Sequence, residues 1–147
     1  MTDVEFTPPH ARLSGLTEEG WSSADVGGFI GLVGPILMRS EGERIRFGFL
    51  ALPKHENLRG VVQGGMIATF CDRALGMAAM KTQNFAAMAT IELAIRYIDV
   101  VRISDFVEIV PEVLRATSSL VFMRGTVMVD TRIVATVDGI WKVLRAR

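Results

Sequence analysis

The order of hydrophobic and polar positions divides the chain into strand-like segments on either side of one helical segment. Residues 44–52 alternate along the chain, which is typical of a strand with one buried face. Residues 27–40 are apolar but contain several glycines and Pro35, which break helices, so we predict an irregular first strand there. From Met88 onward, period-two alternation continues through four further strands, predicted at residues 88–98, 105–116, 120–129 and 132–144.

A helical repeat separates these two groups of strands and is predicted to span Gly64 to about Lys81. Hydrophobic side chains recur there at spacings of three and four, at Ile67, Phe70, Cys71, Ala74, Met77 and Ala78. The opposite face holds small or short residues, namely Ala68, Thr69, Asp72, Gly76 and Ala79. A surface helix would carry Lys and Glu there, so we expect this helix to be covered on nearly all sides.

The predicted order is therefore two strands, one long helix and four antiparallel strands. A helix covered on nearly all sides requires a sheet that curves around it and something that closes the open side, either another chain or a ligand. We expect an α+β fold with an antiparallel sheet wrapped around one central helix, in a dimer or a tetramer. Residues 1–26 are expected to form an N-terminal arm or short helix, with a possible helix start at Thr17, and residues 27–147 a single domain.

Composition narrows the class of protein. Half of the 147 residues are hydrophobic, an upper-end value that leaves room for a subunit interface. Sixteen basic and sixteen acidic residues cancel and no long basic run occurs, so nothing favours nucleic acid or a membrane surface. One cysteine and two histidines do not suit a disulfide framework or a metal cofactor. Without a signal peptide or an apolar membrane span, we expect a soluble, cytoplasmic protein.

The candidate chemistry lies at the start of the helix. Gly64 and Gly65 would leave backbone N–H groups uncovered at the positive end of the helix dipole, which suits a carbonyl oxygen or an anion. Asp72 follows two turns later as the only acid of the helix, and an isolated carboxylate among small residues is a candidate catalytic group. Cys71 is expected to be a small buried core residue.

This element order and the motif around the glycine pair resemble the hotdog-fold acyl-coenzyme A thioesterases, specifically the phenylacetate-pathway type. The residues that match are His55, Asn57, Gly60, Gly64, Gly65, Asp72 and Thr90. The stretch from Gly28 to Pro35 and the closing Gly139-x-Trp141-Lys142 also resemble the family, so the likeness covers roughly residues 27–143.

The resemblance implies a role for each matching residue. Asp72 would activate water as general base or attack the thioester itself, and Thr90 would help to place the water or the carboxylate. Asn57 would hold the water or orient the acyl group, and the Gly64 backbone N–H would stabilise the oxyanion. The family's site lies across a dimer interface, with the loop of one subunit facing the helix of the other.

The remaining site candidates belong to the loop and the pocket. Gln63 stands where the family usually has His; it can hydrogen-bond a carbonyl or fix the loop, but it does not titrate near neutral pH. His55 is expected to fix the loop rather than act as a base. The substrate-binding candidates are His55, Gly65, Met66 and Leu75.

Three function hypotheses remain open. The first is an acyl-coenzyme A thioesterase that needs no cofactor, with coenzyme A entering only as part of the substrate. The second is a non-catalytic acyl-thioester-binding protein, which the Gln63 replacement makes conceivable. The third, a hydratase or dehydratase, is disfavoured because the helix carries no His. The sequence does not specify the acyl group, a coenzyme A or carrier-protein thioester, or a dimer as opposed to a tetramer.

Overall fold

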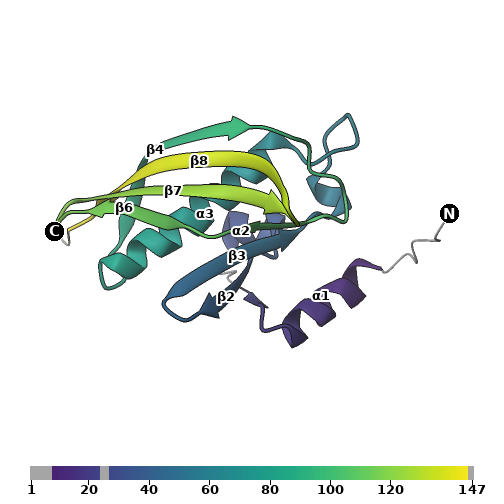
Figure 1. Ribbon diagram of the computed structural model, residues 1–147, viewed down its shortest axis with the longest axis horizontal. Helices are drawn as coiled ribbons and strands as arrows, with labels where there is room; N and C mark the ends of the chain where they lie inside the picture. Colours follow the sequence, from purple (N-terminus) through teal and green to yellow (C-terminus); the bar gives the residue numbers. More distant parts are fainter. Residues whose placement is uncertain (1–7, 24–26, 146–147) are drawn as a thin grey trace.

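The computed structural model describes residues 8–23 and 27–145, and it is organised around the helix α3 (Gly64–Thr82). An antiparallel sheet of eight strands, counted over the described residues, curves across this helix in the order β1-β2-β3-β5-β7-β8-β4 (Figure 1). The strand β6 pairs with β7 outside that path. The predicted architecture, an antiparallel sheet wrapped around one long central helix, is confirmed.

The other elements follow the chain in the predicted order, but the strands after the helix do not form a simple meander, because β4 pairs with β8 at the edge of the sheet and not with β5. The strands are β1 (Ser22–Ser23), β2 (Leu37–Glu41), β3 (Arg44–Leu50), β4 (Met88–Tyr97), β5 (Phe106–Ile109), β6 (Glu112–Ala116), β7 (Leu120–Val129) and β8 (Arg132–Val143). The remaining helices are α1 (Pro9–Glu18), α2 (Gly28–Val33) and the 3-10 turn η1 (Pro53–His55). Among the described helices, none is both long and apolar enough to cross a membrane.

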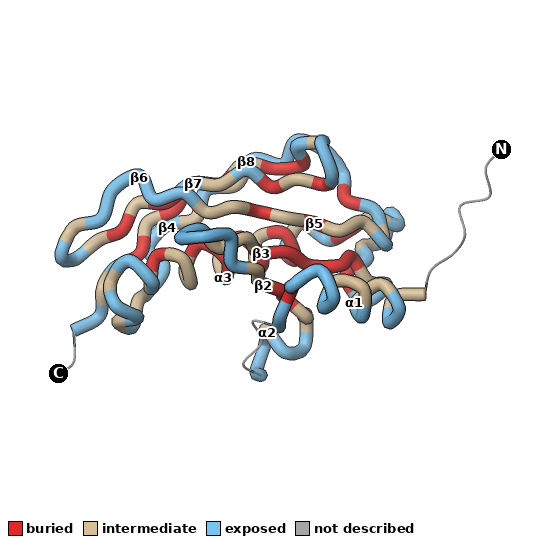
Figure 2. The backbone as a smooth tube through the Cα atoms, turned by 60° about the horizontal axis from the view of Figure 1, so that its bottom comes forward, coloured by how far each residue is buried: buried red, intermediate tan, exposed pale blue. Residues whose placement is uncertain are grey.

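The core lies between α3 and the concave face of the sheet. Buried residues follow β3, β7 and β8 where these strands face the helix (Figure 2). The rings of Phe49 and Phe70 meet edge to face at 4.9 Å and join β3 to the helix. From Met66 to Met80 every residue is buried or half-buried, even though the side away from the sheet is covered only in part. Of the small residues predicted opposite the hydrophobic stripe, Ala79 is fully buried, and the others (Ala68, Thr69, Asp72 and Gly76) are half-buried within one chain.

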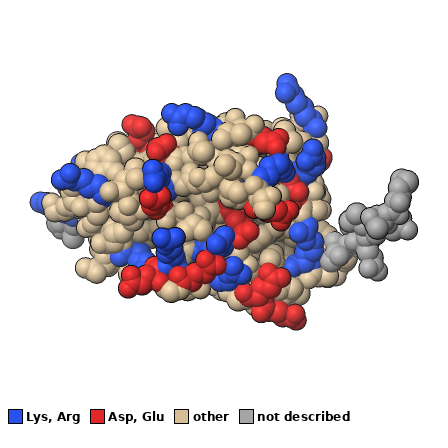
Figure 3. Space-filling model, in the orientation of Figure 1, with Lys and Arg blue, Asp and Glu red and all other residues tan. Residues whose placement is uncertain are grey.

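The convex face of the sheet is polar. Arg124 binds Glu112 at 2.9 Å, Arg46 binds Glu108 at 3.5 Å, and both pairs link neighbouring strands. Basic and acidic side chains are interspersed over the face of the molecule seen in Figure 3. Alternate side chains of these strands thus point to opposite faces of the sheet, as expected, with the core on one face and solvated ion pairs on the other.

Three predicted elements differ from the structure. The irregular strand at residues 27–40 was wrong for residues 28–33, which form α2, and right for residues 37–41, which form β2. The predicted strand at residues 105–116 is split into β5 and β6, because Pro111 cannot donate to a ladder. The N-terminal helix begins at Pro9 and not near Thr17, since Pro at the first helical position is already set for helix geometry.

Trp141 shows how closely α3 approaches the sheet. The indole is 2% exposed and lies over Gly139 of its own strand, where an added Cβ would come within 2.5 Å of the ring. On the other side, a Cβ at Gly76 would lie 3.1 Å from the indole Nε1. The two glycines therefore make room for one large ring between helix and sheet.

Gly76→Leu should consequently destabilise the protein by about 1–3 kcal/mol, because the added side chain overpacks against Trp141. The matched control is Gly15→Leu in α1, where an added Cβ meets nothing within 4 Å. Urea unfolding of both variants checks the prediction. Equal stability of the Gly76 variant and the wild type would contradict this placement of the helix.

Candidate active site

The first turn of α3 presents backbone donors that the protein itself does not use. Gln63 is the N-cap residue, and its carbonyl accepts hydrogen bonds from the N–H groups of Met66 at 2.9 Å and Ile67 at 3.4 Å. Within the described part of the chain, the N–H groups of Gly64 and Gly65 have no acceptor. They lie at the positive end of a helix of 19 residues, which is the arrangement that binds carbonyl oxygens and anions.

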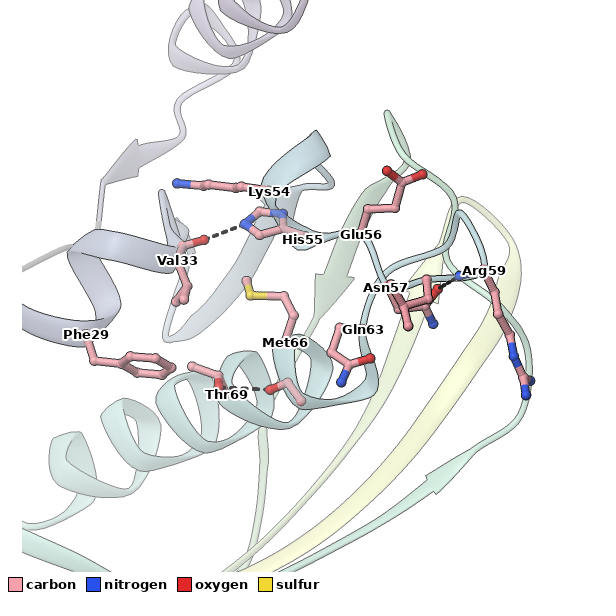
Figure 4. Close-up of a pocket in the computed structure, with 12 residues that line it drawn as sticks. Phe29, Val33, Lys54, His55, Glu56, Asn57, Arg59, Gln63, Met66 and Thr69 are labelled. Carbon is pink, nitrogen blue, oxygen red and sulfur yellow. Dashed lines mark hydrogen bonds between the residues drawn. The ribbon is translucent and has the colours of Figure 1, made fainter.

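A cavity of about 870 Å³ opens beside this turn (Figure 4). Its walls come from α2, from the site loop (defined here as residues 53–63) and from the start of α3. The lining residues are Phe29, Val33, Lys54, His55, Glu56, Asn57, Leu58, Arg59, Gln63, Gly65, Met66 and Thr69. Its size is that of an ordinary small-molecule pocket, and its walls combine apolar side chains with a few polar groups.

His55 fixes the site loop to α2. Its ring is 4% exposed; Nδ1 accepts the Leu52 N–H at 3.0 Å, and Nε2–H donates to the Val33 carbonyl (Figure 4). Burial lowers the pKa of the ring below its usual value, so the neutral form is favoured. Because both nitrogens are occupied, the ring serves as a clamp between the loop and the helix.

Asn57 fixes the tip of the same loop. Its Oδ1 accepts the Arg59 N–H at 2.8 Å and the Val61 N–H at 3.4 Å, and its own backbone N–H donates to the Val61 carbonyl at 2.7 Å. The side-chain NH₂ has no acceptor among the described residues, while the residue lines the cavity. The arrangement leaves one donor of Asn57 for a ligand.

Asp72 and Thr90 form a second cluster away from that cavity. The Thr90 hydroxyl donates to Asp72 Oδ1 at 2.7 Å, at a point where β4 shifts register against β8. Both residues line a smaller cavity of about 150 Å³ together with Met77, Met88 and Trp141. Thr90 thus binds one of the two carboxylate oxygens of Asp72.

The structure therefore divides the predicted site residues into two clusters. Gln63, His55, Asn57, Gly65 and Met66 share the larger cavity, whereas Asp72 and Thr90 share the smaller one. Gly64 lines neither cavity, and its carbonyl accepts a 2.9 Å hydrogen bond from the Tyr97 hydroxyl of β4.

Two further placements concern residues that face the core. Leu75 is fully buried in the core, where a Cβ added at Gly125 would lie 3.5 Å from it. Cys71 is also fully buried, as predicted, and burial raises the pKa of its thiol to about 12. No group of three or more His, Cys, Asp or Glu side chains in the described ranges is arranged to hold a metal ion.

Sequence reasoning missed the contribution of α2 to the cavity. Phe29 and Val33 line it from α2, opposite Thr69 of α3 (Figure 4). The available signal is the Gly28 to Pro35 stretch that resembles the family, but its glycines and Pro35 predict an irregular strand and not a helix. A helix of six residues tolerates Gly31, because it is held by contacts from outside, such as the bond from Lys54 Nζ to the Leu32 carbonyl at 3.0 Å.

Comparison with known proteins agrees with the fold and the motif. The sequence model of the Thioesterase superfamily matches residues 59–136, more than half of the chain. The chain belongs to the thioesterase superfamily.

Individual relatives are more distant. A Pseudomonas aeruginosa protein named "Putative esterase PA0474" is 28% identical over 112 residues, which cover 75% of this chain and 84% of that protein. The phenylacetic acid degradation protein PaaI of Thermus thermophilus, solved as a mutant, superposes with a TM-score of 0.71 at 16% identity, over 79% of this chain and 98% of that one. A Streptococcus mutans protein solved bound to acetyl CoA superposes with a TM-score of 0.68 at 19% identity, over 84% and 97% of the two chains. These two structures share the hotdog fold with this chain.

The clamp role of His55 predicts a pH dependence. An unfolded His titrates near pH 6.5, whereas the folded pKa is lower, so the stability that depends on the neutral ring is lost as the pH falls below about 6.5. The loss has an upper limit of about 1.4 kcal/mol per pH unit. Replacing His55 with Gln should reduce the stability at pH 7.5 and remove this part of its decline toward pH 5.

The measurement is the urea unfolding midpoint of each variant between pH 7.5 and pH 5. In this range the contribution of the histidine to the pH dependence is separated from that of the carboxylates, which titrate at lower pH. His10→Gln is the matched control, since His10 is exposed, and it should keep the wild-type pH dependence. Identical pH profiles for the wild type and the His55 variant would show that the ring is not held neutral.

Proposed function

We propose that the protein is an acyl-coenzyme A thioesterase that hydrolyses its substrate to a free acid and coenzyme A in a site shared by two copies of the chain. The observation that carries this proposal is the separation of the two clusters on one helix. Asp72 lies eight positions after Gly64, which at roughly 1.5 Å per residue places the two about 12 Å apart along the helix axis. Reacting groups must approach to about 3–3.5 Å, so one chain does not complete the site.

The position of β4 at the edge of the sheet supports a dimer in which two chains complete the site together. Thr90, which contacts Asp72, and Tyr97, which contacts Gly64, both belong to this strand. Beyond β8, β4 has no strand partner in the described chain, and Ile91 and Tyr97 are each 56% exposed. A two-fold axis at the middle of β4 would pair this strand with its copy in antiparallel orientation and bring the Thr90 end of one subunit alongside the Tyr97 end of the other. Asp72 would then face the glycine turn of the other subunit.

The chemistry of such a site follows from the groups on each side. The thioester carbonyl would accept the free N–H groups of Gly64 and Gly65, which would stabilise the oxyanion; one such donor is typically worth about 3 kcal/mol of barrier. The side-chain NH₂ of Asn57 and the amide of Gln63 would orient the acyl group in the larger cavity. The acetyl CoA bound to the Streptococcus mutans protein supports coenzyme A as the thiol part of the substrate.

Asp72 would supply the carboxylate for hydrolysis. Thr90 holds Oδ1, so the other oxygen is the one available to take a proton from water as the water attacks the carbonyl carbon. When the tetrahedral intermediate collapses, the C–S bond breaks and the thiolate leaves, taking up the proton from Asp72 or from solvent. The reaction needs no cofactor. Direct attack by Asp72 on the carbonyl is the nucleophilic variant of the same geometry.

Asp72→Asn should lower kcat by about 100-fold or more, because an amide can neither accept the proton nor attack. The assay follows free thiol released from short-chain, medium-chain and aromatic acyl-coenzyme A substrates. The matched control is Asp130→Asn in the exposed turn between β7 and β8, whose φ of +52° suits Asn as well as Asp. If the wild type binds these substrates saturably but releases no thiol, it is a non-catalytic binder, and the proposal fails.

Subunit mixing tests the shared site directly. Asp72→Asn chains and Asn57→Ala chains should each be inactive alone, but a mixed dimer would contain one site with an intact loop and an intact helix. Random re-association should therefore restore about a quarter of the wild-type activity, since half of the dimers are mixed and each has one competent site of two. Activity that stays at the level of the separate variants after verified subunit exchange would place the whole site within one chain.

A further inference from the structure

The site loop is held at its second end by a neighbouring segment, the backing loop (defined here as residues 98–105), which connects β4 to β5. The Val62 N–H donates to the Val101 carbonyl at 2.8 Å, and Val61 pairs with Arg102 in an isolated antiparallel bridge. Val101 is buried, so this contact is sheltered from water. Any movement of the backing loop therefore moves residues 61 and 62, which directly precede Gln63 and the glycine turn.

The pairing of Val61 and Val62 with the backing loop also affects Asn57. The Val61 carbonyl accepts the Asn57 N–H at 2.7 Å, and the Val61 N–H donates to Asn57 Oδ1 at 3.4 Å. His55 clamps the first end of the loop through its ring, but the tip at Asn57 is held through Val61. The backing loop is thus the support for both the Asn57 amide and the turn that leads into α3.

Arg132 holds the backing loop together. Its guanidinium, at the first residue of β8, donates from Nη1 to Asp99 Oδ2 at 2.8 Å and to the Val100 carbonyl at 2.7 Å, and from Nη2 to Asp105 Oδ2 at 3.3 Å. Asp105 Oδ2 also accepts the Arg102 N–H at 2.8 Å, which closes the loop on itself. A planar guanidinium can bind three acceptors in one plane, whereas an ammonium cannot reproduce that fork.

Charge reinforces this arrangement. The hydrogen bond from Arg132 lowers the pKa of Asp99, so this carboxylate stays ionised at neutral pH. The side chains of Arg132 and Asp105 are 32% and 23% exposed, so this pair is less screened than the Arg124–Glu112 pair, whose side chains are 54% and 58% exposed.

We propose that Arg132 is a positioning residue: through the backing loop it sets the place of Asn57 and of the α3 N-terminus, and so controls turnover without touching the substrate. The catalytic part of this inference rests on the thioesterase function proposed above. None of the contacts that carry it involves a residue lining the smaller cavity, so Asp72 and Thr90 are not part of this support. Arg132 itself lines neither cavity.

The test compares Arg132→Met with Arg124→Met. Arg124 is the matched control because it is also a strand arginine with a carboxylate partner, Glu112, bound through two hydrogen bonds of 2.9 Å, but it lies on the convex face. Arg132→Met should lower kcat at least 10-fold with KM changed less than about 3-fold, because a displacement of about 1 Å in a positioned group is that costly. Arg124→Met should keep both constants within about 2-fold.

Amide hydrogen exchange supplies a readout that does not depend on activity. In Arg132→Met, exchange at Asn57 and Val62 should become at least about 10-fold faster, while exchange in β3 and in the middle of α3 stays as in the wild type. Arg132→Lys should show a smaller change in the same direction, since one charged donor remains. Asp99→Asn, which removes the charge of one partner of the guanidinium, should do likewise.

The outcomes separate the two proposals. A wild type that releases no thiol removes the thioesterase function, and hydrogen exchange alone then decides whether Arg132 supports the site loop. An active wild type with unchanged kcat and unchanged loop exchange in Arg132→Met overturns the positioning role. If Arg132→Met does not fold, Arg132→Lys and Asp99→Asn decide by the same two readouts, and wild-type values in both overturn it.

Discussion

The burial of α3 is the constraint on which the rest of the structure depends. Its 19 residues include one acid and two bases, so the helix would expose a large apolar surface if it stood free in water. The sheet removes one side of that surface by curving across it, and small residues such as Gly76 let the helix approach as closely as Trp141 allows. The remaining side is only half-covered by the chain's own residues. A helix of this composition accounts for both the curved sheet and the unfinished side.

The same helix explains why the candidate site has two parts. The N-terminus of the helix supplies unpaired N–H groups beside the larger cavity. The Asp72 carboxylate, about two turns further along the helix, is bound by Thr90. These groups are set apart by helix geometry, which no side-chain rearrangement changes. In the proposed dimer, a two-fold partner paired along β4 would bring the N–H groups of one subunit close to the carboxylate of the other. The proposed function thus follows from the rigidity of the helix as much as from the identity of its residues.

The loops around the helix N-terminus show a different kind of dependence. The site loop has little secondary structure of its own, so each of its functional groups is placed by a contact from elsewhere. His55 is held by Leu52 and Val33, and Val62 is held by Val101. A hydrogen-bond donor stabilises the charge that develops in a transition state only if the donor is already held in place. Polar groups that anchor loops are therefore expected near such donors. In this chain the anchors are a buried neutral histidine on one end and an arginine fork behind the other.

Much of the fold could be predicted from the sequence, because periodicity reports directly which face of an element is buried. β7 begins and ends where the alternation predicted, and α3 ends within one residue of its predicted end. The motif also singled out the two residues that the structure joins by a hydrogen bond, Asp72 and Thr90. The sequence could not reveal α2, since six residues rich in glycine carry no reliable periodicity, nor the break at Pro111, which depends on which strand lies alongside.

The sequence by itself determined the local choices: an apolar helix with a bare N-terminus, alternating strands, and a single helix carboxylate on a face of small residues. These follow from side-chain chemistry at fixed spacings and need no knowledge of distant contacts. Only the tertiary structure decided which groups meet. It placed Phe29 of α2 opposite Thr69, enclosed Leu75 in the core, and set Arg132 behind the site loop. Such pairings join residues that are far apart in the chain. They could not be predicted from the sequence, because packing and hydrogen bonding depend on distance in space and not on distance along the chain.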